Sequence, residues 1–427
     1  MNYQQTIQYL YNSTPVFEHV GASAYKEGLS NSLALDAHLG APHRTFKSIH
    51  VAGTNGKGST SHALAAILQA CGLRVGLYTS PHLVDFRERI RVNGAPVPEA
   101  FVVDFVAKHR AFFEPLHPSF FELTTAMAFA YFAESKVDVA VIEVGLGGRL
   151  DCTNIISPIL SVITNISLDH TGFLGDTLAK IAAEKAGIIK PNTPVVVGET
   201  TAETRPVFEN TAKEHHAPVT WAEEEPEVLQ WQHRPEGGIA LQTRSFGELV
   251  FELGGDYQHL NANTILTTIS QLQALGFGIT AKEVAQGMAS VCRSTGLMGR
   301  WQTLGRAPLV VCDTGHNVAG WLYLSKQIAA QSYRKLRMVF GMVDDKDLDT
   351  VLTLLPKDAA YYFTQASTHR AVPADIVAKQ AAKKGLQGTT YNNVKAAYDA
   401  ALSDAATDDF VFVGGSSYVV ADLLSAL

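Results

Sequence analysis

The stretch HVAGTNGKGST, residues 50–60, decides how the first half of this chain folds. The apolar residues before it predict a buried strand over residues 46–52, and residues 59–70 predict the helix that follows. A glycine-rich turn between a strand and a helix directs backbone N–H groups at a phosphate. Lys57 is placed to reach the β- and γ-phosphates of a nucleotide. The strict phosphate-loop pattern fails at Val51, so the loop alone does not separate a kinase, a ligase and a GTPase-like switch.

Outward from this loop, strands and helices alternate, which predicts an α/β fold with mainly parallel sheets. The apolar runs 137–144 and 159–166 are typical of central parallel strands. Further strands are expected at 74–79 and 194–198, helices at 121–133, 178–189, 264–275 and 282–289, and antiparallel strands within 223–255. After Arg300, strands at 309–313, 337–341, 361–364 and 410–414 alternate with helices at 318–329, 348–354, 374–383 and 418–427. A linker over 294–299 predicts two domains, 1–296 and 297–427.

The composition is that of an ordinary globular protein. Of 427 residues, 46% are hydrophobic and 18% are charged, and the formal net charge is −7. This charge argues against a nucleic-acid binder, which carries a basic face. No run approaches the roughly 18 apolar residues of a membrane span, and the N-terminus does not read as a signal peptide. The four cysteines form no C-x-x-C pair and fit a reducing compartment, so we expect a cytoplasmic protein without membrane or nucleic-acid partners.

Three more loops follow predicted strands and carry polar side chains. Ser80 ends a strand in YTSPHL, Glu143 ends the run VDVAVIEV, and His170 follows ILSVITNI beside Asp169. Because ligands of open α/β sheets bind outside the carboxyl ends of the strands, these loops are expected at the same edge as the phosphate loop. Ser80 and Glu143 offer the oxygen ligands that Mg²⁺ prefers, and His170 is a third candidate ligand beside them.

Other candidates are weak when taken singly. Asp313, after a predicted strand, could accept a hydrogen bond from ribose or orient a metal-bound water, and His316 could contact phosphate. Arg300 could clamp phosphate through two parallel hydrogen bonds. Asn261 could read adenine through its amide. The residue pattern alone favours a solvated helix lysine at Lys185.

The chain carries a series of motifs in a fixed order. They are GTNGKGS (53–59), SPHLVDFRERIRVNG (80–94), FFELTTAMAF (120–129), EVGLGGRLDCTN (143–154), LDHTGFLG (168–175), EKAGI (184–188), MGR (298–300), DTGHN (313–317) and VFGMVDDKDL (339–348). On these motifs, the sequence from about residue 20 to the C-terminus resembles the Mur ligase superfamily, and within it the folylpolyglutamate synthase family with its bifunctional dihydrofolate synthase form. The resemblance implies a P-loop ATPase domain followed by a smaller Rossmann-like glutamate ligase domain.

The resemblance also implies the site. The implied ATP-binding residues are Thr54, Asn55, Gly56, Lys57, Gly58, Ser59, Asn261, Arg300 and Asp313, and Lys57, Lys185, His170 and His316 would serve catalysis. Two magnesium ions are implied, with Ser80, Glu143 and His170 as ligands. The reading of Lys185 is reversed, because the matching lysine of the family is carbamylated and its new carboxylate helps to hold the second ion. The pterin substrate would contact Phe121, Glu122, Leu123, Thr124, Leu150, Asp151 and Cys152, together with Tyr25 and Lys26.

The implied reaction adds L-glutamate to the carboxylate of dihydropteroate, of folates, or of both, through an acyl phosphate, and a monomer is expected. One alternative is a cell-wall Mur ligase, which carries a nucleotide-sugar domain ahead of the phosphate loop where this sequence has only about fifty residues. The other is a P-loop switch or binding module without ligase activity, for which phosphate release would not depend on an amino acid.

Overall fold

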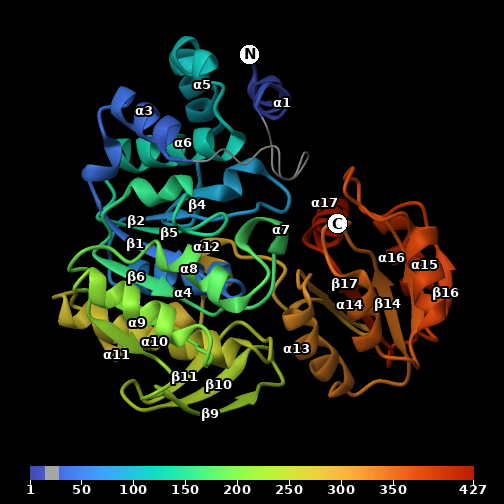
Figure 1. The fold of residues 1–427 in the computed structure, drawn as a ribbon. Helices are drawn as coiled ribbons and strands as arrows, with labels where there is room; N and C mark the ends of the chain where they lie inside the picture. Colours follow the sequence, from blue (N-terminus) through green and yellow to red (C-terminus); the bar gives the residue numbers. More distant parts are fainter. Residues whose placement is uncertain (15–27) are drawn as a thin grey trace. The chain divides into compact units, whose positions relative to one another are not determined.

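The computed structural model describes residues 1–14 and 28–427, and the chain divides into two compact units (Figure 1). Unit 1 comprises Met1–Gln232, Ile239–Glu252 and Gln258–Leu297. Unit 2 comprises His233–Gly238, Leu253–Tyr257 and Met298–Leu427. The two short segments of unit 2 that precede residue 260 were not predicted from the sequence.

Unit 1 is built on an eight-stranded sheet in the order β4-β3-β2-β5-β1-β6-β7-β8. Its strands are β1 Lys47–Ala52, β2 Val75–Tyr78, β3 Ile90–Val92, β4 Ala95–Pro96, β5 Val139–Glu143, β6 Leu160–Ile163, β7 Val195–Val197 and β8 Val219–Trp221. The strands from β2 to β8 in this order are parallel, and β3 and β4 are antiparallel to their neighbours. A phosphate loop after β1 therefore lies between the loops that follow β5 and β6.

Helices cover this sheet (Figure 1). They are α1 Tyr3–Ser13, α3 Ser30–His38, α4 Lys57–Ala70, α5 Glu99–Phe113, α6 Phe120–Glu134, α7 Thr171–Leu174, α8 Leu178–Ala186, α9 Arg205–Glu214, α10 Gln258–Ala274, α11 Ala281–Met288 and α12 Val291–Thr295, with 3₁₀ turns at Pro42–Arg44, Phe86–Arg89, Glu114–Leu116 and Cys152–Ile155. Residues of α6 pack with Ile142 of β5, and residues of α8 and α9 pack with Ile163 of β6. The helix α4 is almost wholly buried and packs against α10, α11 and α12. A small antiparallel sheet of β9 Val228–His233, β10 Ile239–Thr243 and β11 Glu248–Phe251 follows, as expected for 223–255.

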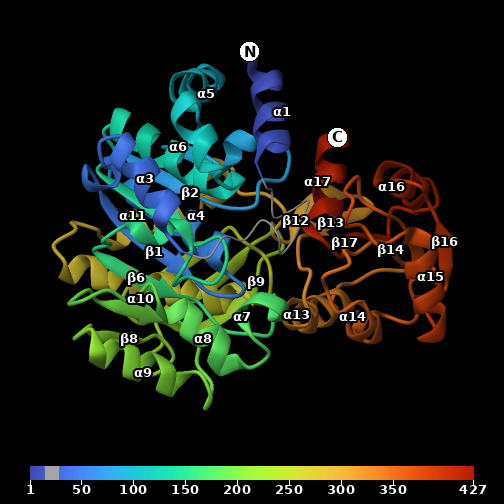
Figure 2. The same ribbon diagram turned by 45° about the horizontal axis from the view of Figure 1, so that its top comes forward.

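Unit 2 contains a six-stranded sheet in the order β12-β13-β17-β14-β15-β16 (Figure 2). Its strands are β12 Gln302–Arg306, β13 Leu309–Asp313, β14 Leu336–Phe340, β15 Ala360–Phe363, β16 Gly388–Thr390 and β17 Phe410–Gly414, and only β12 is antiparallel to its neighbour. The helices are α13 Val318–Ala329, α14 Leu348–Leu354, α15 Ala374–Lys383, α16 Val394–Ser403 and α17 Ser417–Ala426. Trp321, which is fully buried, packs with Phe340 and Phe412 in the core.

The predicted α/β class with mainly parallel sheets is confirmed. The helix expected at 264–275 begins earlier, at Gln258, so that Asn261 lies within its first turn. The predicted division at residues 296 and 297 stays a prediction. None of the described helices has the length and apolar character needed to cross a membrane.

Candidate active site

The phosphate loop joins β1 to α4 through two glycines with left-handed backbone angles. Gly53 has φ 146° and Gly56 has φ 83°, and a Cβ on Gly53 would collide with Thr164. Such angles favour glycine, because other residues are strained there. Lys57 begins α4, and its Nζ donates hydrogen bonds to the carbonyl oxygens of Gly53 (3.1 Å) and Thr54 (3.2 Å). The lysine thus lies folded over its own loop, with its ammonium at the turn where phosphate oxygens are expected.

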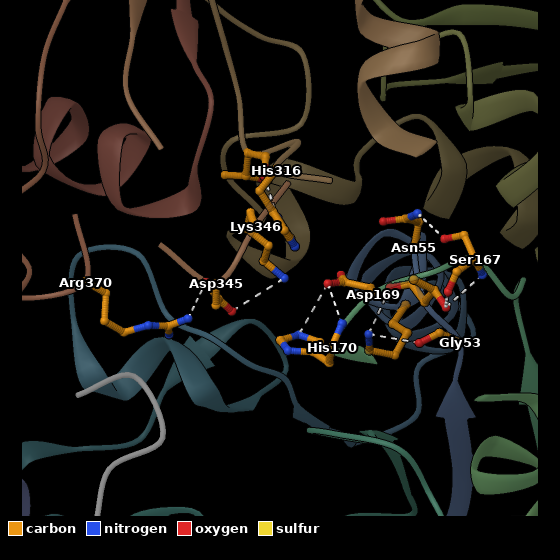
Figure 3. A network of polar contacts seen from close by, with 12 residues as sticks. Gly53, Asn55, Ser167, Asp169, His170, His316, Asp345, Lys346 and Arg370 are labelled. Carbon is orange, nitrogen blue, oxygen red and sulfur yellow. Dashed lines mark hydrogen bonds and ion pairs between the residues drawn. The ribbon is translucent and has the colours of Figure 1, made fainter. Parts of the chain in front are cut away.

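The segment after β6 forms hydrogen bonds with the phosphate loop (Figure 3). The backbone N–H of Thr54 donates to the Asn165 carbonyl (2.8 Å), and that of Asn55 donates to the Asn165 side-chain oxygen (3.0 Å). The Asn55 side chain donates to the Ser167 hydroxyl at 3.2 Å. Sequence reasoning did not single out Asn165 or Ser167, since nothing in the local pattern shows which strand will pair beside β1.

The first turn of α10 also packs against the phosphate loop and the start of α4. Gln258 donates to the Ser59 hydroxyl at 3.1 Å and accepts from the Asn261 amide at 2.9 Å. A Cβ on Gly56 would collide with Asn261 Oδ1. The structure therefore brings Asn261 to the phosphate loop, and its proposed reading of adenine stays a prediction.

The ends of two neighbouring strands, β2 and β5, carry the two oxygen donors of the expected metal site. Glu143 ends β5 directly opposite Val51 of β1, and only 4% of it is exposed. Its Oε2 accepts from the backbone N–H of Ser80 at 3.2 Å, so Ser80 and Glu143 meet as predicted from their strand ends. In the described part of the chain, no group of three or more His, Cys, Asp and Glu side chains could hold a metal. A pair of oxygen donors still fits magnesium, which keeps waters and substrate phosphates as its other ligands.

His170 follows Asp169 at the end of the loop after β6. It precedes α7 with φ 50°, and its backbone N–H donates to Asp169 Oδ1 at 2.8 Å. The His170 ring Nε2 lies 3.9 Å from the same oxygen (Figure 3). The loop thus presents an imidazole and a carboxylate together, while the metal-ligand role of His170 stays a prediction.

Lys185 is buried on α8, with 4% of the residue exposed, so the reading of a solvated lysine from the residue pattern alone is wrong. Burial lowers the pKa of its ammonium to about 7, with the nearby Lys57 cation acting in the same direction. The carboxylates of Asp169, Asp151 and Glu184 act in the opposite direction. A lysine of this pKa is partly neutral at physiological pH, which is the form that reacts as a nucleophile.

The loop after β5 is organised by Asp151. Its carboxylate accepts from the backbone of Leu146 (2.9 Å) and Thr153 (3.0 Å) and from the Thr153 hydroxyl (2.5 Å). Burial raises the pKa of this carboxyl group, and only 4% of Asp151 is exposed. The Asp151 oxygens accept hydrogen bonds within the loop, and its predicted contact with substrate stays a prediction. The neighbouring Leu150 is less buried.

The predicted substrate residues at the start of α6 have different surroundings. Phe121 stacks on Tyr78 with ring centroids 5.6 Å apart, and Thr124 shares a hydrogen bond of 3.0 Å with the Tyr78 hydroxyl. Glu122 caps the helix by accepting from the Ser119 backbone at 2.6 Å. The side chains of Leu123 and Thr124 are 0% exposed, and Cys152 is 8% exposed. Their contact with substrate stays a prediction, and Tyr25 and Lys26 lie outside the described residues.

In unit 2, Asp313 ends β13 and is 2% exposed. It accepts from the Tyr257 hydroxyl (2.8 Å) and from the backbone N–H groups of Trp301 (2.7 Å) and Gly315 (2.8 Å). Burial raises the pKa of the Asp313 carboxyl group. The Arg300 guanidinium, which acts against this shift, donates to the Thr314 hydroxyl.

The ring Nδ1 of His316 lies 3.0 Å from the Thr314 carbonyl. The sequence-predicted residues of unit 2 therefore gather at one strand end, around the Gly299 and Thr314 backbone, whereas their roles in ATP binding stay predictions.

A charged group of unit 2 was missed by sequence reasoning. Arg370 Nη2 lies 2.5 Å from Asp345 Oδ1, and Lys346 Nζ lies 3.9 Å from Asp345 Oδ2 (Figure 3). Only 13% of the Arg370 side chain and 7% of the Lys346 side chain are exposed. The motif VFGMVDDKDL includes Asp345 and Lys346, but only the pairing of residues 343 and 371 brings Arg370 to them.

Comparisons with known proteins agree with this arrangement. Residues 51–263 match the Mur ligase middle domain, and residues 299–417 match the Mur ligase glutamate ligase domain. The folylpolyglutamate synthase of Lacticaseibacillus casei is 33% identical over 100% of this chain and 99% of its own length. A protein of Haloferax volcanii named as a probable bifunctional folylpolyglutamate synthase/dihydropteroate synthase is also 33% identical, over 99% of this chain. The chain spans about half the length of that relative (50%) and of its counterpart in Halobacterium salinarum (49%).

Solved structures are similar over the whole chain. A folylpolyglutamate synthase of Mycobacterium tuberculosis complexed with ADP and AMPPCP has a TM-score of 0.88, 32% identity, and covers 99% of this chain and 98% of its own. Escherichia coli FolC in complex with DHPP and ADP has a TM-score of 0.83 and 30% identity, covering 100% and 97%. The bifunctional synthase of Yersinia pestis complexed with AMPPNP and a Mn ion has a TM-score of 0.82 and 31% identity, covering 100% and 98%.

Both matched domain families are those of Mur ligases, so the fold and the phosphate-loop site define a Mur-type ligase. The relatives that align from end to end narrow the class further. The chain belongs to the folylpolyglutamate synthase and dihydrofolate synthase family, whose members are ATP-dependent ligases.

Proposed function

We propose that this protein uses ATP to join L-glutamate to the carboxylate of dihydropteroate and of folates that already carry glutamate. One observation carries the proposal: the phosphate loop and the Ser80–Glu143 pair lie at neighbouring strand ends of one sheet, and the buried Lys185 of α8 lies near Lys57 and Asp169 of the same edge. The structures of relatives with ADP, with DHPP and with AMPPNP and Mn support the same substrates for this chain.

The proposed reaction has two steps. The acceptor carboxylate attacks the γ-phosphorus of ATP, the bond to the β-phosphate oxygen breaks, and ADP leaves behind an acyl phosphate. The amine of L-glutamate then attacks the acyl carbon, phosphate leaves, and the amine loses a proton as the amide forms. Negative charge on the transferring phosphoryl group must be stabilised where it develops, and this is the place of Lys57.

Lys57 must exchange partners in this reaction. Its ammonium donates to the Gly53 and Thr54 carbonyl oxygens, and a bound phosphate would offer it stronger, charged acceptors. The N–H groups at the start of α4 would face the same phosphate. When bound by Ser80 and Glu143, Mg²⁺ would supply further charge stabilisation to the phosphates. Two ions, with His170 at one of them, are part of the proposal.

Lys185 is proposed to be carbamylated. Its neutral amine would add to CO₂ and lose one proton, which replaces a buried cation with a carboxylate. The pKa near 7 supports this step, because about half of the amine is then neutral at physiological pH. The carbamate would serve as an oxygen ligand for magnesium, not as a base. A monomeric cytoplasmic enzyme is also proposed, and the free cysteines at 71, 152, 292 and 312 fit a reducing compartment.

The test is phosphate release from ATP with L-glutamate, using dihydropteroate and tetrahydrofolate as separate acceptors. Release with both acceptors is the expected result and makes the enzyme bifunctional. Release with tetrahydrofolate alone would restrict it to polyglutamate synthesis. Release that does not require glutamate would contradict the ligase proposal.

A further inference from the structure

A buried histidine lies directly upstream of the phosphate loop. His50 is in β1, three residues before Gly53, and is 0% exposed. Its Nε2 lies 2.8 Å from the Thr153 hydroxyl, which lies 2.5 Å from Asp151 Oδ1. The Asp151 carboxylate receives three further hydrogen bonds from N–H groups of its own loop, and it accepts the hydrogen bond from the Thr153 hydroxyl. The Thr153 hydroxyl has a single proton and gives it to Asp151.

This order of donors fixes the protonation of the ring. With the Thr153 proton committed to Asp151, His50 must donate from Nε2, so the neutral Nε2–H tautomer is present. Its Nδ1 is buried and has no hydrogen-bond partner within the described residues. Burial lowers the pKa of His50 to about 3, and the nearby Lys190 cation acts in the same direction. The imidazole therefore remains an uncharged donor at physiological pH.

The hydrogen-bond relay from His50 through Thr153 ends at Asp151, which organises the loop after β5. Asp151 accepts from the backbone of Leu146, Thr153 and Gly145, so one carboxylate closes the turn from residue 145 to residue 153. A Cβ on Gly145 would collide with the Phe121 ring. A Cβ on Gly148 would lie 3.1 Å from Lys185 Cα. The same turn thus borders both the predicted pterin-binding phenylalanine and the helix of Lys185.

We propose that His50 is a positioning residue, which holds the 145–153 turn through Thr153 and Asp151 in the shape that seats the acceptor. The inference rests on the proposed function, because it assumes a folate acceptor beside this turn. If this position served packing alone, an apolar side chain would give a more stable fold, because the Nδ1 atom of His50 is buried without a hydrogen bond. A histidine at this position is explained by the hydrogen bond that its Nε2–H donates to the Thr153 hydroxyl.

The test compares Thr153→Val, which removes the hydroxyl at nearly constant size, with Thr153→Ser, which keeps it. We expect Thr153→Val to raise the KM for the folate acceptor about tenfold, as for other supporting residues of a site. The KM for ATP should remain within about twofold, and Thr153→Ser should behave as wild type. The single change His50→Phe should reproduce the effect, and adding Thr153→Val to it should have little further effect, because both changes break one relay.

A second measurement does not depend on turnover. Hydrogen exchange of the 145–153 peptide should be faster in Thr153→Val than in Thr153→Ser, because the Leu146 and Gly145 amides lose a fixed acceptor. Equal exchange in the two variants, or an equal rise in both KM values for Thr153→Val, would overturn the inference. If wild-type enzyme releases no phosphate with any acceptor, the proposed function fails, and the exchange rates still decide whether the relay holds the turn.

Discussion

Replacing Gly56 by alanine tests the most crowded point of the phosphate loop. The residue has φ 83°, and an added Cβ would collide with Asn261 Oδ1. The left-handed backbone costs alanine about 1–2 kcal/mol. Moving the Asn261 side chain breaks its hydrogen bond to Gln258, which contributes about 1 kcal/mol. We therefore expect Gly56→Ala to lower the free energy of unfolding by about 2–3 kcal/mol, the sum of the backbone cost and the lost hydrogen bond.

Gly72 offers a matched control at the other end of the same helix. It has φ 79°, and nothing lies within 4 Å of its added Cβ, so Gly72→Ala carries the backbone cost alone. Urea unfolding followed by circular dichroism should show a loss about 1 kcal/mol larger for Gly56→Ala than for Gly72→Ala. Calorimetry should show weaker ADP binding for Gly56→Ala only. Asn261→Ala should cost little more stability in the Gly56→Ala background, because the hydrogen bond to Gln258 is already broken there. Equal stability losses for the two glycine variants, or a further loss of about 1 kcal/mol when Asn261→Ala is added to Gly56→Ala, would refute the reasoning.

Three further outcomes are expected. Lys57→Ala should lower kcat by about 10²–10³-fold with an unchanged circular dichroism spectrum, because one stabilising charge at the phosphoryl group is lost; turnover within a few fold of wild type would contradict its role. Glu143→Gln should raise the magnesium concentration for half-maximal activity about tenfold or more, and coinciding titration curves would remove it from the ligands. His50 has a pKa of about 3 in the folded chain against an ordinary value of 6.5, so the unfolded chain binds more protons between these values and stability falls as the pH falls. At pH 5 this loss is about 2 kcal/mol relative to pH 7, and it should be absent from His50→Gln in paired urea titrations; identical pH slopes would contradict the burial argument.

Much of the fold could be predicted because the strands and helices of an α/β protein leave strong local patterns. The predicted ranges of β13 and α13 agree with the structure to the residue, and the run VDVAVIEV contains β5. The strands β3, β4, β8 and β16 were missed; each is only two or three residues long and lacks the run of valines that marks the equally short β7. The helices α1, α3, α5, α9 and α16 were also missed, although α1 begins with a capping box at Asn2.

The site was only partly predictable from residues alone. Ser80 and Glu143 were found because Ser80 closely follows one strand and Glu143 ends another, and the carboxyl ends of neighbouring parallel strands share one edge. Lys185 was misread from its local pattern, since the 145–149 loop that packs on α8 lies almost forty residues away in sequence. The substrate contact of Asp151 stays a prediction, whereas its hydrogen bonds to Leu146 and Thr153 within its own loop could not be predicted from the sequence pattern.

The position of β5 between β1 and β2 sets an order of events during synthesis. The strand β1 and the strand β2 do not pair with each other; both pair with β5, whose residues 139–143 are made later. The nascent chain therefore carries two unpaired strand edges until residue 143 has emerged, a state prone to mispairing with other chains. The phosphate loop can take its final conformation only later in synthesis, because Asn165 and Ser167 form hydrogen bonds with it. The proposed ATP site is complete only when Gln258 and Asn261 of α10 have also been made, and nucleotide binding by chains truncated at different lengths would report when the site has formed.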